Sequence, residues 1–134
     1  PTKLPARAAS GPALAAMGST LFVAWSDMDS HRLCVRSSQD GIFFDNEVIL
    51  DEITDVRPAL GTDEKYLYLA WKEKRGDGLI KLLQSKTGID WHKLPASPLP
   101  DSPLNSGHPA LASSGRGLII GWTNPTLHIA GKIY

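Results

Sequence analysis

The chain has 134 residues with 14 basic and 14 acidic side chains, so its formal net charge is zero. This balance excludes partners held mainly by bulk charge, and we expect neither a nucleic-acid nor a membrane partner. No apolar run approaches the ~20 residues of a membrane-spanning helix, and the length suits a single domain that buries a core.

Three stretches of the sequence are near copies of one another. They read GPALAAMGSTLFVAW from Gly11, RPALGTDEKYLYLAW from Arg57 and HPALASSGRGLIIGW from His108. The tryptophans that end them are 46 and 51 residues apart. A repeat of this length is typical of propellers and related arrays.

In chain order, residues 1–10 come first and align with the segment that precedes the second copy, so they predict a strand that ends a unit. The first full unit, 11–56, predicts an inner strand at the Pro-Ala-Leu segment and strands at 21–25, 32–38 and 46–52. The second unit, 57–107, predicts an inner strand and strands at 67–71, 79–85 and 92–96. The third unit, 108–134, predicts an inner strand and strands at 118–122 and 126–132.

The second strand of each unit alternates with a period of two, and both alternating sets are largely apolar. Leu67, Leu69 and Trp71 alternate with Tyr68 and Ala70, for example. Such strands are covered on both faces. We therefore expect an all-β fold of four-stranded units too small to be stable alone, which is the blade of a β-propeller.

Two segments after the third strands carry a resemblance to a known family. SSQDGIFF at 37–44 and QSKTGIDW at 84–91 are similar to Asp-boxes, the Ser-x-Asp-x-Gly-x-x-Trp/Phe hairpins. With the repeat, they make the chain resemble the sialidase-like (Asp-box, or BNR-repeat) β-propellers of the bacterial tandem-repeat type. When the glycines are aligned, Gln39 and Lys86 stand at the aspartate position.

What the resemblance implies concerns the fold more than catalysis. In the family the Asp-box hairpin is a structural turn on the outer side of the blade. The resemblance also favours a secreted or cell-surface location. Sialidases of this kind use three arginines, a Tyr/Glu pair and an acidic Asp, and no such set can be placed here. We therefore name no catalytic residue and do not expect an enzyme.

The chain holds three blades' worth of strands, whereas propellers close with about four to eight blades. Two arrangements remain open. Two copies can form a six-bladed ring in which each N-terminal strand, residues 1–7, completes the last blade of the other copy. Alternatively, the chain is part of a longer propeller. We expect the homodimer, because a two-fold ring is closed and every blade then has four strands.

Two sets of residues are candidates for ligand binding. Arg57 and His108 each precede a Pro-Ala-Leu segment, which places them at the mouth of the central channel. The second set consists of the repeated tryptophans and the polar residues that follow them: Trp25, Trp71 and Trp122 with Asp27, Glu73 and Asn124. An aromatic face beside polar groups suits a sugar ring. The tryptophans also suit the core between blades, and both interpretations stay open.

No motif points to a metal or a cofactor, and we expect none. The four histidines lack metal-ligand spacing with each other or with Cys34, which we expect to be a small buried side chain. The function that these patterns favour is a non-enzymatic, lectin-like propeller that binds glycans. The alternatives are a sialidase-like glycoside hydrolase or a fragment without a ligand.

Overall fold

The computed structural model describes residues 3–75, 78–95, 97, 107–114, 117–124 and 126–131. These residues form antiparallel strands joined by turns, with no helix among them, which confirms the all-β prediction. Sheet 1 contains β1 (Ala13–Met17), β2 (Thr20–Ser26), β3 (Arg32–Ser38) and β4 (Asp45–Ile53). Sheet 2 contains β5 (Ala59–Thr62), β6 (Leu67–Lys72), β7 (Ile80–Ser85) and β8 (His92–Lys93). Sheet 3 contains β9 (Ala110–Ser114), β10 (Gly117–Asn124) and β11 (Thr126–Gly131).

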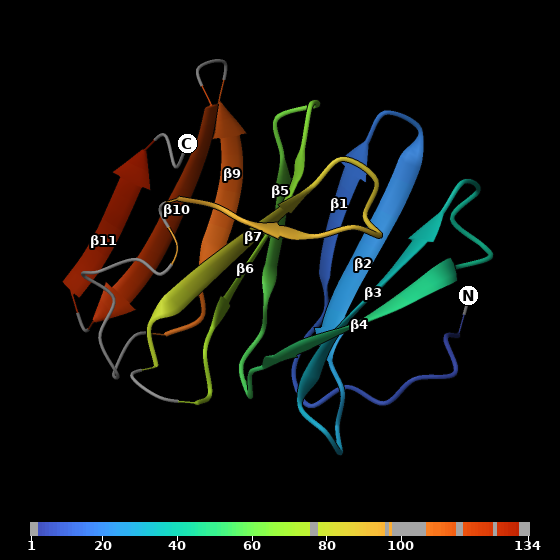
Figure 1. The fold of residues 1–134 in the computed structure, drawn as a ribbon, viewed down its shortest axis with the longest axis horizontal. Helices are drawn as coiled ribbons and strands as arrows, with labels where there is room; N and C mark the ends of the chain where they lie inside the picture. The colour runs from blue at the N-terminus through green and yellow to red at the C-terminus, as the bar shows by residue number, and fades with distance from the viewer. Residues whose placement is uncertain are drawn as a thin grey trace.

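Each sheet is an up-and-down meander in which consecutive strands pair. The first strands of the three sheets lie next to one another, β1 against β5 and β5 against β9. Figure 1 shows this row of first strands, with sheet 1 and sheet 3 at opposite ends of the stack. Within the described part of the chain, no helix is long and apolar enough to cross a membrane.

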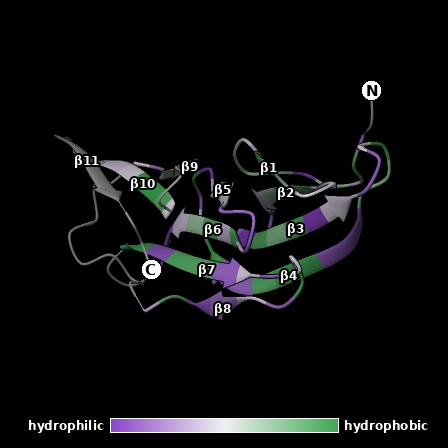
Figure 2. Cartoon of the chain, turned by 90° about the horizontal axis from the view of Figure 1, so that it is seen from above, coloured by the Kyte–Doolittle hydropathy of each residue, from purple (hydrophilic) through white to green (hydrophobic). Residues whose placement is uncertain are grey.

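Apolar side chains fill the spaces between neighbouring sheets. Between sheets 1 and 2, Phe22 and Val35 of sheet 1 pack with Leu69 and Trp71 of sheet 2. Between sheets 2 and 3, the alternate residues of sheet 2 pack with those of sheet 3, and the cluster includes Tyr68, Ala70, Leu82, Leu118, Ile120 and Trp122. Figure 2 shows apolar stretches in β3 and β4 of sheet 1 and in β7 of sheet 2. Sheet 2 is therefore covered on both faces, as the double apolar alternation indicated.

The hairpins compared with Asp-boxes are held by side chains that accept backbone N–H groups. The carboxylate of Asp40 accepts from the N–H groups of Ile42 and Phe43 at 2.8 and 2.9 Å. In sheet 2, Thr87 Oγ1 accepts from the N–H groups of Ile89 and Asp90 at 3.1 and 3.2 Å. The accepting position is thus the residue directly before each glycine. The glycine-based alignment, which chose Gln39 and Lys86, placed it one residue too early.

The N-terminal residues differ from the prediction. Residues 3–10 form no strand, although a single bridge joins Ala8 to Asp27. The segment crosses sheet 1, where the N–H of Met28 donates to the carbonyl of Arg7 at 2.9 Å. It lies at the opposite end of the stack from β11, so β11 is not beside it (Figure 1).

The last strand of sheet 2 is also shorter than predicted. The prediction covered 92–96, but β8 ends at Lys93. Pro95 has no N–H to donate to a ladder, so the strand ends before it.

Candidate functional site

The three Pro-Ala-Leu segments meet in one pocket of about 270 Å³. It is lined by residues 12–14, 57–60 and 108–111, which are the starts of the three first strands and the residues just before them. Proline suits the first position of a strand because it has no N–H to leave unpaired there. We call this the inner-strand pocket. It brings together Arg57 and His108, which the sequence could only place in separate repeats.

Arg57 lies against the backbone of the neighbouring repeat. A Cβ placed on Gly11 would be 3.0 Å from Nε of Arg57 and 3.4 Å from its Nη2. Glycine at this position therefore leaves room for the guanidinium between the two segments. The three residues that precede Pro-Ala-Leu thus play different parts, since Gly11 makes space, whereas Arg57 and His108 supply polar groups.

Arg57 and His108 are both exposed at the pocket. Among the residues that the structure describes, no carboxylate is within ion-pair distance of Arg57. A guanidinium without an ion-pair partner and an imidazole that line the same pocket can bind an anionic or hydroxyl-rich ligand, because both groups can donate hydrogen bonds.

The repeated tryptophans lie in the cores rather than on a free surface. Trp25, Trp71 and Trp122 are 4%, 1% and 7% exposed. Trp71 is packed between sheets 1 and 2, and Trp122 between sheets 2 and 3. A sugar ring stacks on an aromatic face only where that face is open. The interpretation of these residues as core between blades therefore fits Trp71 and Trp122, whereas Trp25 lines a pocket on sheet 1.

Glu73, which follows β6, is buried in a charged cluster. It is 2% exposed, and its two carboxylate oxygens are 3.5 Å from Nε of Arg75 and 3.4 Å from Nζ of Lys81. Burial raises the pKa of Glu52, and so do its hydrogen bond to Glu73 and the repulsion between the two carboxyl groups. Burial also opposes ionisation of Glu73, but hydrogen bonds from Glu52, the N–H of Arg75 and Lys81 outweigh it and lower its pKa. The cluster ties sheet 1 to sheet 2.

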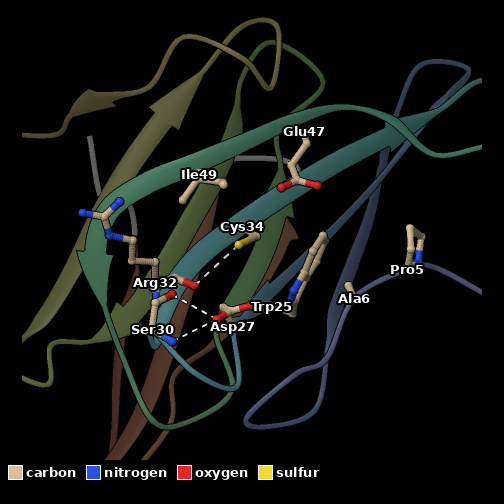
Figure 3. Close-up of a pocket in the computed structure, with 9 residues that line it drawn as sticks. All are labelled: Pro5, Ala6, Trp25, Asp27, Ser30, Arg32, Cys34, Glu47 and Ile49. Atoms are coloured by element: carbon tan, nitrogen blue, oxygen red, sulfur yellow. Dashed lines mark hydrogen bonds between the residues drawn. The ribbon is translucent and has the colours of Figure 1, made fainter.

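A second pocket, of about 330 Å³, lies on the face of sheet 1 that points away from sheet 2 (Figure 3). Trp25, Cys34 and Ile49 line it together with the N-terminal segment. Asp27 borders it, but its carboxylate already accepts hydrogen bonds from Ser30 and the N–H of Asp29, and these lower its pKa. Burial raises the pKa of the Cys34 thiol to about 11, so the thiol stays protonated at neutral pH.

Asn124, the remaining candidate, ends β10 with its backbone opposite Thr126. Its side chain lies outside the described residues. The groups that the sequence reasoning missed are the partners of Glu73, because Glu52 comes from another sheet. The position of Lys81 does indicate a buried charged cluster, because a charged residue between Ile80 and Leu82 in a buried strand needs a partner of opposite charge.

No protein-family model matches the chain, and no curated protein matches it.

Proposed function

We propose that the chain is a non-enzymatic binding propeller of the sialidase-like kind, which binds carbohydrate at the inner-strand pocket. Its three meander sheets, packed face to face with their first strands in a row, are the expected form of adjoining blades. The observation that carries the ligand site is the meeting of Arg57 and His108 from successive repeats in one pocket.

The chemistry of the pocket favours an acidic sugar. A guanidinium binds a carboxylate through two parallel hydrogen bonds, and Arg57 has no carboxylate partner among the described residues. The imidazole of His108, in the same pocket, can donate to a hydroxyl or carboxylate oxygen. A volume of about 270 Å³ is at the small end of ligand pockets, which favours a single terminal sugar over a longer glycan.

The alternative is a glycoside hydrolase, which needs two carboxyl groups that flank one cavity. None of the residues that line the inner-strand pocket carries a carboxyl group. The carboxyl pair that lies close together is Glu52 and Glu73, and neither residue lines that pocket. The described residues thus favour binding over hydrolysis.

A glycan array with neutral and acidic sugars tests the proposal. We expect acidic terminal sugars to bind, and Arg57→Ala to weaken binding about 10–100-fold, the effect of losing a charged hydrogen-bond pair. Lys65→Ala is the matched control, because Lys65 is an exposed cation in the turn at the other end of β5. Equal binding by both variants would contradict the site. Turnover of a fluorogenic sialoside that Arg57→Ala abolishes would instead favour the hydrolase.

A further inference from the structure

We infer that the open face of sheet 1, together with residues 3–10, docks sheet 3 of a second copy of this chain. Two such head-to-tail contacts close a ring of six sheets. The inference concerns an interaction surface and does not depend on which ligand the pocket takes. It rests on contacts that recur at the repeat distance.

The first recurring contact is a backbone hydrogen bond. The N–H of Lys74, after β6, donates to the carbonyl of Ile53, the last residue of β4, at 3.0 Å. One repeat of 46 residues earlier, the N–H of Met28 donates to the carbonyl of Arg7 at 2.9 Å. Arg7 therefore contacts sheet 1 in the same way as Ile53, at the end of β4, contacts sheet 2.

The second recurring contact is apolar. Leu50 of β4 packs against the cluster between sheets 1 and 2. Leu4, again 46 residues earlier, packs against Val23, Trp25 and Cys34 on the open face of sheet 1. Since β4 is the outer strand of the sheet that precedes sheet 2, residues 3–10 occupy the place of the outer strand of a sheet that precedes sheet 1. None of the three sheets formed by the described residues lies there (Figure 1).

The open face of sheet 1 carries the same apolar pattern as the buried face of sheet 2. Leu60 and Leu67, which face sheet 1, are 7% and 0% exposed. The residues one repeat earlier, Leu14 and Leu21, are 69% and 40% exposed. The same face also has the pocket shown in Figure 3, at the position where sheet 2 is covered by sheet 1.

Two arginines on this face already have carboxylate partners. Arg36 pairs with Glu47, and Arg32 lies 3.4 Å from Asp51. Paired charges are less costly to cover than isolated ones, because each keeps a partner when water leaves.

The open face of sheet 3 resembles the face of sheet 2 that packs against sheet 3. In sheet 2, the small residues Ala59 and Gly61 are buried where β5 meets β9, and a Cβ on Gly61 would be 3.0 Å from Cβ of Leu111. Their counterparts in sheet 3, Ala110 and Ala112, are exposed. Small residues allow the first strand of a neighbouring sheet to approach closely, so this face suits a sheet like sheet 1.

A second copy of the chain offers both matching faces at once. Sheet 3 has three strands among the described residues, and residues 3–10 of the other copy lie where a fourth would pair with β11. Pairing of this kind adds backbone hydrogen bonds across the contact. Two copies give six sheets, within the range of about four to eight for closed propellers, and the two contacts are related by a two-fold axis. The channel would then be lined by two copies of Arg57 and His108.

Light scattering on the chain over a dilution series tests the assembly. We expect twice the chain mass of 14.5 kDa. A folded monomer, or a ladder of larger species without a stop at two, would overturn the inference. Either result would leave the ligand proposal to be judged by the glycan array, because the pocket lies within one copy.

Two variants test the two faces separately. Leu14→Glu charges the open face of sheet 1, and Ala112→Glu charges that of sheet 3. Both residues are exposed in the single copy, so the fold should survive, which circular dichroism checks. We expect both variants to be monomers, whereas Ile89→Glu, in the exposed β7–β8 hairpin, stays dimeric as the control. A dimer lost only in Leu14→Glu would mean that sheet 1 docks on sheet 1 and would overturn the head-to-tail contact.

Discussion

The backbone of Gly88, in the hairpin between β7 and β8, lies directly against the aromatic ring of Phe22 in sheet 1. A Cβ on Gly88 would be 2.3 Å from Cε1 of Phe22, and the glycine has a φ of +80°. Phe22 is 2% exposed and is packed in the cluster between the two sheets, so its ring has little room to move away. The hairpin of one sheet thus sets its distance from the next through a residue without a side chain.

Gly88→Ala is therefore expected to destabilise the fold by about 2–4 kcal/mol, from backbone strain and from crowding of the Phe22 ring. Gly18→Ala is the control. Gly18 also has a positive φ, of 60°, but a Cβ there would meet nothing within 4 Å. Gly18→Ala should therefore lower the free energy of unfolding by only about 1 kcal/mol. Urea unfolding of the two variants measures the difference, and equal losses would show that the ring moves aside.

The hairpin turns allow a prediction that separates two alignments of the repeat. Asp40 accepts two backbone N–H groups, and Thr87 does the same in sheet 2 with a neutral hydroxyl. A carboxylate accepts more strongly, so Thr87→Asp should stabilise the protein by about 0.5–1 kcal/mol. Lys86→Asp, at the position chosen by the glycine-based alignment, should give no such gain.

The pH dependence of that gain provides a further check. The backbone N–H of Phe43 is the main cause that lowers the pKa of Asp40. A carboxylate held in the same way at position 87 stabilises the fold above the ordinary aspartate pKa of 3.8 and loses this effect as the pH falls through its lowered value. Thermal unfolding at neutral and acidic pH measures it. A gain that persists in acid would contradict the hydrogen-bond explanation.

The buried pair of Glu52 and Glu73 predicts opposite effects of pH. The pKa of Glu52 is raised, so its contribution is complete below the ordinary value of 4.5 and is lost as the pH rises through its folded value. The pKa of Glu73 is lowered, so its contribution is present above 4.5 and is lost in acid. Glu52→Gln, which cannot ionise, should therefore be more stable than the natural chain at neutral pH, and this advantage should vanish near pH 4.5.

Urea unfolding midpoints of Glu52→Gln and the natural chain between pH 4.5 and 7.5 measure this advantage. Asp45→Asn, which removes an exposed carboxylate at the start of β4, controls for the general change in charge. If Glu52→Gln is no more stable than the natural chain at any pH, the raised pKa is not a property of the folded state.

The local patterns of the sequence predicted the positions of most strands. The period of two in Leu67–Trp71 and its copies placed β2, β6 and β10, because burial on alternate faces depends only on neighbours along the chain. The repeat also placed Arg57 and His108 at equivalent positions, and the sheets then brought them into one pocket. These features follow from local propensity and from the repeat itself.

Features that depend on contacts between sheets could not be predicted from the sequence. Glu73 meets Glu52, which is 21 residues away and in another sheet, and no local pattern indicates that approach. The burial of Trp71 likewise depends on the presence of sheet 1. The aspartate position of the first hairpin was assigned to Gln39 instead of Asp40 for a different reason. Alignment on the glycines does not consider which side-chain oxygen can reach the backbone N–H groups.

Hydrogen exchange at Met28 and Lys74 gives a prediction with an internal control. Both amides donate to a segment of the preceding repeat. The partner of Lys74 is in β4, whereas the partner of Met28 is in the N-terminal segment, residues 3–10, which belongs to no strand. If a second copy pairs with residues 3–10, the segment is fixed only in the assembly. Protection of the Met28 amide should then fall on dilution below the dissociation constant, while that of Lys74 stays the same. Equal protection of both amides at every concentration would show that sheet 1 alone holds the segment, and that docking adds nothing to its order.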